Sequence, residues 1–183
     1  TTEYICYPNS AQRIAQAMPN IKLITLLRNP IDRAYSHYHH TKRMGMESLS
    51  FEEAITKEDE RVNKYKKKIL EDENYYHSNY HYYTYLSRGI YADQIKDWLQ
   101  LFNKDQILVL KSEDFFNKPS TNFKQVLEFL ELASWDPKHY KQLNSNSYQN
   151  MIDSQTRKKL VDYYKPHNER LYQLLDMNFG WDQ

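Results

Sequence analysis

Two short apolar runs, each followed by a helical pattern, constrain the fold of this chain more than any other feature. Residues 21–27 and 106–110 are nearly continuous in apolar side chains, which is typical of buried parallel strands. Strands that alternate with helices predict an α/β fold built in layers on a parallel sheet. Because two parallel strands alone make a poor core, we expect further strands from residues before Thr1.

Helical signals fill most of the remaining sequence. Asn29-Pro30 predicts a helix start directly after the first strand, with Asn as N-cap and Pro at the first helical position, and the pattern continues to about Arg43. Ser50 and Glu53 fit a capping box. Residues 57–73 carry six positive and six negative side chains, which indicates a solvated helical face. Further helices are expected over residues 9–18, 91–102, from Pro119 onward, and over 154–175.

The tyrosines are unusual. Seven of the 17 fall between Tyr75 and Tyr91, and two interpretations stay open. They could line a ligand cleft, because aromatic rings stack on sugars and pack against acyl chains, or they could be amphipathic packing at the edge of the sheet. Trp98 and Trp181 are expected in the core.

Length, charge and cysteine count describe one ordinary domain over residues 1–183. The chain has 25 Lys and Arg against 24 Asp and Glu, a net charge of +1, so no global field draws it to nucleic acid or to a membrane surface. Cys6 is the only cysteine, which excludes an internal disulfide and suits a reducing compartment. No apolar run approaches the roughly 18 residues of a membrane span. We therefore expect a cytoplasmic protein without a membrane span.

Glycine is scarce. Gly45, Gly89 and Gly180 are the only three, whereas an average domain of this length holds about 13. Their spacing excludes a G-x-G-x-x-G fingerprint and a G-x-x-x-x-G-K-[ST] loop within this sequence. A phosphate bound by these residues would need side chains and helix ends, and a glycine-containing phosphate loop would have to precede Thr1.

The segment 26–38 contains the residues that point to chemistry. Arg28 stands at the carboxyl end of the first strand, where open α/β sheets bind ligands. The helix that follows offers free N–H groups and the positive end of its dipole. Ser36 lies in the second helical turn, and Arg33 lies one turn before it. A planar guanidinium with a hydroxyl at a helix start suits a phosphate monoester, so these three residues are the candidate anion-binding set.

Simpler interpretations exist for the same region. Arg28 could pair with a nearby acid such as Asp32 and bind nothing. His37, His39 and His40 lie close together on one helix, but no H-E-x-x-H pattern or partner carboxylate accompanies them. We therefore expect them at the surface, and we expect no metal.

Arg28-Asn29-Pro30-x-x-Arg33-Ala34-x-Ser36 resembles the 3′-phosphate-binding signature of sulfotransferases that depend on PAPS (3′-phosphoadenosine-5′-phosphosulfate). Both the strand-Arg-helix context and the interval from Arg to Ser match. The resemblance covers nearly the whole chain and is closest to the heparan-type and bacterial, polyketide-associated branch. The other residues that match the family's pattern are Gly89, Tyr91, Trp98, Leu99, Phe102, Glu113, Asp114, Tyr163, Tyr164, Asn168, Phe179 and Trp181.

The resemblance implies a three-layer α/β/α sulfotransferase fold of the P-loop nucleotide-kinase type. It places Arg28 and Ser36 on the 3′-phosphate of PAPS, with Arg33 adding charge nearby. The implied reaction moves a sulfuryl group to an acceptor hydroxyl, on a glycan or a polyketide-like chain, and leaves PAP (3′-phosphoadenosine-5′-phosphate). Members of the family also use a Lys on a 5′-phosphosulfate loop and a Glu or His base.

Two departures from the family pattern qualify this prediction. A K-x-G-T-type 5′-phosphosulfate loop is absent from the sequence, so we expect the chain to be the carboxyl-terminal two-thirds of a sulfotransferase domain, and its catalytic residues are unassigned. The heparan-type K-G-R-x-H-P stretch is replaced by Ser145–Asn150, which favours a bacterial-type member. Lys111, Arg157 and Lys158 are alternative cations for the second phosphate. A non-catalytic PAP(S)-binding or structural module is the alternative function.

Overall fold

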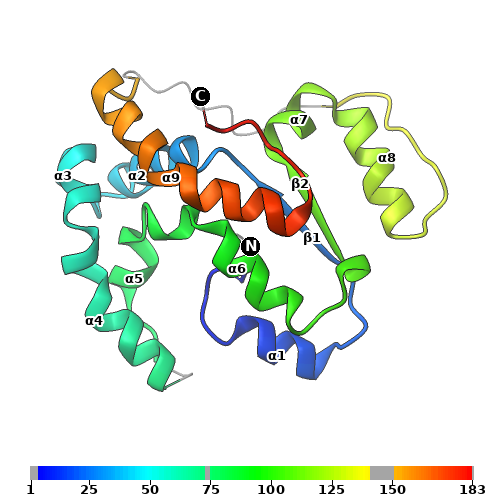
Figure 1. Ribbon diagram of the computed structural model, residues 1–183, viewed down its shortest axis with the longest axis horizontal. Helices are drawn as coiled ribbons and strands as arrows, with labels where there is room; N and C mark the ends of the chain where they lie inside the picture. Colours follow the sequence, from blue (N-terminus) through cyan, green and yellow to red (C-terminus); the bar gives the residue numbers. More distant parts are fainter. Residues whose placement is uncertain (1–3, 73–74, 141–150, 183) are drawn as a thin grey trace.

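A parallel pair of strands surrounded by helices forms the centre of the protein (Figure 1). The computed structural model describes residues 4–72, 75–140 and 151–182. Strand β1 (Leu23–Leu27) pairs with β2 (Ile107–Lys111), with Leu23 opposite Ile107 and Leu27 opposite Lys111. Both apolar runs are therefore strands, as predicted, and the described ranges contain no third strand.

Nine α-helices and two 3-10 turns make up the rest of the described chain. They are α1 (Ser10–Ala17), α2 (Pro30–Arg43), α3 (Phe51–Thr56), α4 (Glu58–Glu71), α5 (Ser78–Tyr83), η1 (Ser87–Gly89), α6 (Tyr91–Leu99), η2 (Lys104–Gln106), α7 (Ser112–Asn117), α8 (Pro119–Phe129) and α9 (Ser154–Leu175). The last helix has the bounds that the sequence predicts.

Helices cover the two faces of the sheet in different ways. Leu27 and Val109 face α6, α9 and the closing segment with Phe179 and Trp181, and together they form the main core cluster. Side chains alternate along a strand, so Leu110 points to the other face, where α7 and α8 contact β2 (Figure 1). The result is three layers. On this second face β1 is open, since Ile24 and Leu26 are 36% and 47% exposed.

The turn from β1 into α2 follows local rules. The Asn29 side chain accepts a hydrogen bond from the Ile31 N–H at 3.0 Å, and Pro30 takes the first helical position. Pro30 and Ile31 are both buried, so the helix start is fixed against the core. The carboxyl end of β1 and the amino end of α2 therefore meet at a defined point, and Arg28 lies between them.

Helices α3 to α5 form a separate corner, at the left of Figure 1. The predicted capping box is present, because Ser50 and Glu53 bond to each other's backbone N–H. The charged helix is confirmed as α4, but its first residue is not solvated: Glu58 is buried. Its carboxylate accepts the Ser87 N–H at 2.9 Å and also the Leu86 N–H, so the prediction of a wholly solvated face was wrong there.

The structure favours packing over a cleft for the central part of the tyrosine-rich segment. Tyr80 and Tyr85 are 8% and 0% exposed. Tyr91, at the end of the segment, is 5% exposed but also lines the groove described below. The Tyr85 hydroxyl donates to Glu47 Oε2 at 2.8 Å, and Arg61 pairs with the same oxygen at 2.7 Å. These rings are parts of the core. Trp98 and Trp181 are buried too, as expected.

Candidate anion-binding groove

A groove of about 1370 Å³ runs along the open edge of β1 and beside α2. Its lining is apolar on one side and cationic on the other. The charged and histidine side chains that line it are Arg28, Arg33, His37, His40, Arg43 and Arg88, and no described lining residue is acidic. A concave surface that carries one sign of charge concentrates ligands of the opposite sign. The groove thus suits an anionic ligand with an apolar part.

Arg28 enters this groove directly after the last residue of β1. Within the described part of the chain its guanidinium forms no ion pair, and the acid considered as its partner lies elsewhere: Asp32 pairs with Arg157 at 2.9 Å. The simpler interpretation of Arg28 therefore fails. The guanidinium remains available to a ligand at the amino-terminal end of α2, where the helix dipole and the first N–H groups favour negative charge.

Arg33 and Ser36 lie on the face of α2 that lines the same groove. The structure therefore brings Arg28, Arg33 and Ser36 together around one cavity. Arg33 also donates from Nη2 to the Tyr85 carbonyl, so part of its guanidinium holds the neighbouring segment. His40 and Arg43, on later turns of α2, also line the groove.

Arg88 also reaches the groove, from η1, and is a site residue that none of the sequence patterns above predicts. The segment before it is held by Glu58, which binds the Leu86 and Ser87 N–H groups, and by the Tyr164 hydroxyl, which donates to the Leu86 carbonyl at 2.9 Å. Gly89 then passes so close to Pro30 that an alanine Cβ would lie 2.9 Å from the proline Cβ. Only glycine permits this contact. The Arg88-Gly89 pair was the sequence signal that could have revealed it.

Several buried polar atoms near the groove lack a hydrogen-bond partner among the described residues. They include Arg33 Nε, His37 Nδ1, Arg88 Nε, Gln94 Oε1 and Ser112 Oγ, and all five residues line the groove. Ser112 is only 8% exposed and follows the carboxyl end of β2. Buried polar groups are nearly always paired in native proteins. Their concentration here fits a site that is completed by a polar ligand.

The three histidines of α2 differ from one another in exposure. His40 is exposed as expected, but His37 is largely buried and its ring packs on that of Tyr85, with centroids 5.0 Å apart. Burial, followed by the charges of Arg33 and Arg88, lowers the pKa of His37 to about 2. The prediction of a surface role was wrong for His37, because η1 folds over the helix. The described residues contain no group of three His, Cys, Asp or Glu side chains that could hold a metal ion.

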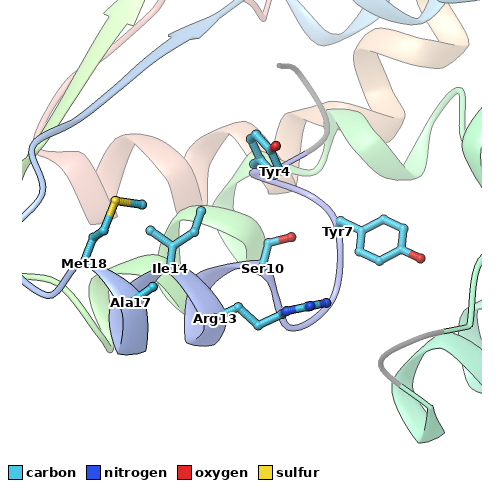
Figure 2. A pocket seen from close by; sticks show the side chains of 7 residues that line it. All are labelled: Tyr4, Tyr7, Ser10, Arg13, Ile14, Ala17 and Met18. Carbon is cyan, nitrogen blue, oxygen red and sulfur yellow. The ribbon is translucent and has the colours of Figure 1, made fainter.

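A second, smaller pocket of about 460 Å³ lies on α1 (Figure 2). Tyr4, Ile14 and Met18 line both pockets, so the two adjoin. Figure 2 shows the side chains of Ile14 and Met18 rising from α1, with Tyr4 above the helix. Among the described residues that line it, Arg13 is the only charged one. This pocket is less suited to a phosphate than the groove.

Two of the three alternative cations already have partners within the protein. Lys111 donates to the Phe179 carbonyl at 2.6 Å, and Arg157 pairs with Asp32. Lys158 is exposed on α9. The segment Ser145–Asn150 lies outside the described residues.

Comparisons with known proteins identify the family to which this fold belongs. The sulfotransferase domain family model matches residues 9–170. The chain is 26% identical to the membrane-associated sulfotransferase kil1 of Dictyostelium discoideum, over 99% of this chain and 52% of that protein. It is 30% identical to the bifunctional heparan sulfate N-deacetylase/N-sulfotransferase 1 of Xenopus tropicalis, over 90% of this chain and 20% of that protein. The chain thus spans about half or less of these relatives.

A solved structure shares the fold. The sulfotransferase from Alicyclobacillus acidocaldarius superposes with a TM-score of 0.78 and 30% sequence identity, covering 98% of this chain and 65% of that one. This confirms the α/β sulfotransferase fold with a parallel sheet. In the described ranges no helix is both long and apolar enough to cross a membrane. The strand–Arg–helix geometry, the family match and the shared fold lead to one conclusion: the chain belongs to the sulfotransferase domain family.

Proposed function

We propose that residues 1–183 form part of a sulfotransferase domain that binds PAPS through its 3′-phosphate and transfers the sulfuryl group to an acceptor hydroxyl. One observation carries the proposal: Arg28, which forms no ion pair with a described residue, stands at the junction of β1 and α2 in a cationic groove. Ser36 lies on the same groove wall, and Arg33 adds charge. Such an arrangement suits a phosphate monoester.

The reaction would break the bond between sulfur and the bridging oxygen of the phosphosulfate and form a new bond from sulfur to the acceptor oxygen. The acceptor hydroxyl loses its proton, and PAP leaves. In this proposal the described residues bind the 3′-phosphate and orient the nucleotide. Holding the donor in place makes the transfer step effectively unimolecular, which lowers its barrier. The apolar wall with Ile24, Leu26 and Phe116 would contact the nucleoside or the acceptor.

We propose a glycan as the acceptor. The support is that several relatives are named as carbohydrate or heparan sulfate sulfotransferases, a 3-O-sulfotransferase among them, together with His40 and Arg43, which extend the groove lining beyond Ser36. Transfer of radioactive sulfate from labelled PAPS to a desulfated glycosaminoglycan, compared with transfer to an apolar alcohol, tests this choice. A higher rate with the apolar alcohol would favour a polyketide-like acceptor. A cytoplasmic location remains a prediction.

The 3′-phosphate assignment has a direct test by calorimetry. PAP and 5′-AMP differ by the 3′-phosphate alone, so wild type should prefer PAP. Arg28→Ala should weaken PAP binding by roughly 30-fold or more, since a buried charge-assisted contact is worth about 2–4 kcal/mol, and should leave 5′-AMP binding nearly unchanged. Ser36→Ala should weaken PAP binding by a smaller factor.

Arg13→Ala is the matched control, because Arg13 is an exposed arginine outside the groove lining. It removes the same charge and should leave PAP affinity unchanged within twofold. Equal PAP binding by wild type and Arg28→Ala would show that the assignment is wrong. PAP binding without any sulfate transfer, with every acceptor tried, would favour the non-catalytic alternative.

A further inference from the structure

The peptide group between Arg28 and Asn29 is held at both of its polar atoms by distant side chains. The Tyr91 hydroxyl donates to the Arg28 carbonyl at 3.0 Å. The Asn29 N–H donates to Glu113 Oε1 at 2.7 Å. The carbonyl and the N–H belong to one planar unit, so the two bonds together fix the orientation of that plane. We call this pair of bonds the peptide clamp.

The clamp lies where the backbone has no regular partner. β1 ends at Leu27 and α2 begins at Pro30, so the peptide between them is outside both the β1–β2 ladder and the helix. A buried N–H or carbonyl without a partner destabilises the folded state. The two side chains satisfy these groups. The direction in which the Arg28 side chain leaves the backbone depends on the peptide planes on both sides of its Cα. The clamp holds the second of these planes, and the first follows Leu27, the last residue of β1.

The positions and burial of Tyr91 and Glu113 suit them to hold this peptide. Tyr91 opens α6 and is 5% exposed. Burial raises the pKa of Tyr91 to about 12, so its hydroxyl keeps the donated proton throughout the neutral range. Glu113 lies in the first turn of α7. Its second oxygen, Oε2, is buried and has no hydrogen-bond partner among the residues described. Within the described chain, the Glu113 carboxylate is therefore held by the bond that Oε1 accepts from the Asn29 N–H.

We propose that Tyr91 and Glu113 are positioning residues that orient Arg28 for its anionic ligand through the Arg28–Asn29 peptide. Glu113 is outside the groove lining, whereas Tyr91 is part of it, so the double-mutant cycle below must separate positioning from a direct contact of Tyr91 with the ligand. The consequence for PAP rests on the proposed function, whereas the clamp itself can be tested without any ligand.

The ligand-free test is hydrogen exchange of the Asn29 amide, followed by NMR on the whole protein. In Tyr91→Phe and Glu113→Ala this amide should exchange at least tenfold faster than in wild type, while buried amides of α6 and α9 stay protected. Glu113→Gln keeps an acceptor oxygen and should retain most of the protection. Exchange of Asn29 that is unchanged in both disrupting variants would overturn the proposal.

The second test is calorimetry with PAP. Tyr91→Phe and Glu113→Ala should weaken binding about three- to tenfold, the loss expected when one hydrogen bond no longer holds a binding group. Glu113→Ala and Glu113→Gln remove the same negative charge, so the difference between them isolates the hydrogen bond. Tyr38→Phe is the matched control: Tyr38 is also buried and donates to a backbone carbonyl, that of Leu49 at 2.9 Å.

A double-mutant cycle separates positioning from general damage. If the clamp acts through Arg28, adding Tyr91→Phe or Glu113→Ala to Arg28→Ala should weaken PAP binding no further. A full additional loss in the Arg28→Ala background would overturn the proposal. If wild type does not bind PAP at all, the proposed function fails, and the exchange of the Asn29 amide still decides for or against the clamp.

Discussion

Replacing Gly89 by alanine tests how tightly the groove is built. An alanine Cβ at this position would lie 2.6 Å from the Tyr164 hydroxyl oxygen, 2.8 Å from Tyr164 Cε1 and 2.9 Å from Pro30 Cβ. All three distances are shorter than real Cβ contacts. Neither neighbour can move easily, because Tyr164 and Pro30 are both fully buried. The η1 turn must therefore shift away from the start of α2.

The magnitude follows from these contacts. Overpacking of a core costs about 1–3 kcal/mol, and loss of the bond from Tyr164 to the Leu86 carbonyl adds about 1 kcal/mol. Alanine restricts the unfolded chain more than glycine and returns about 0.4–1 kcal/mol. We expect a net loss of about 2 kcal/mol in the free energy of unfolding. Since η1 carries Arg88, PAP binding should weaken several-fold as well.

Urea unfolding followed by tryptophan fluorescence measures this loss, because Trp98 and Trp181 are buried and become exposed on unfolding. Gly45→Ala is the control: no described residue lies within 4 Å of its added Cβ, so its expected cost comes from the positive φ of 73°, about 1 kcal/mol. If Gly89→Ala loses less than about 0.5 kcal/mol with an unchanged m value, the close approach does not constrain the fold and the reasoning is wrong.

Three further predictions concern the buried charges and the ligand. The pKa of His37 is about 2 in the folded protein and about 6.5 in the unfolded chain, so between these values only the unfolded state binds the extra proton. Between pH 7.5 and 5.5 the free energy of unfolding of wild type should therefore fall by about 1.4 kcal/mol relative to that of His37→Gln, as measured by urea unfolding. Arg61→Met should cost about 3 kcal/mol in the same assay, because it leaves the fully buried Glu47 carboxylate without its cation, and a cost below about 1 kcal/mol would contradict this. Dialysis against EDTA should leave the PAP affinity within twofold, and a larger loss would indicate a bound metal.

Local signals predicted the elements that local physics decides. The N-cap of α2, the capping box of α3 and the bounds of α9 all depend on residues within a few positions of each other. The same holds for the placement of Arg28, because a residue that follows an apolar parallel strand must lie at the edge of the sheet where ligands bind. These predictions required no knowledge of distant contacts.

The errors occurred where distant segments meet. Glu58 stands in a charge run that is solvated over most of its length, but the segment at Leu86 and Ser87 folds onto it and uses its carboxylate. His37 lies on a polar stretch of α2, but the ring of Tyr85 covers it. Neither partner can be inferred from helical spacing, since both come from other elements of the chain.

The sequence by itself determined the layered α/β class, the strand-Arg-helix motif and the family resemblance, because these depend on periodicity, capping and short spacings. The tertiary structure alone decided what surrounds Arg28. It removed Asp32 as a partner, brought Arg88 into the groove and placed Tyr91 and Glu113 on the two ends of one peptide group. These residues meet because packing the sheet between two helical layers brings together positions 60 to 130 residues apart, and no local pattern encodes such contacts.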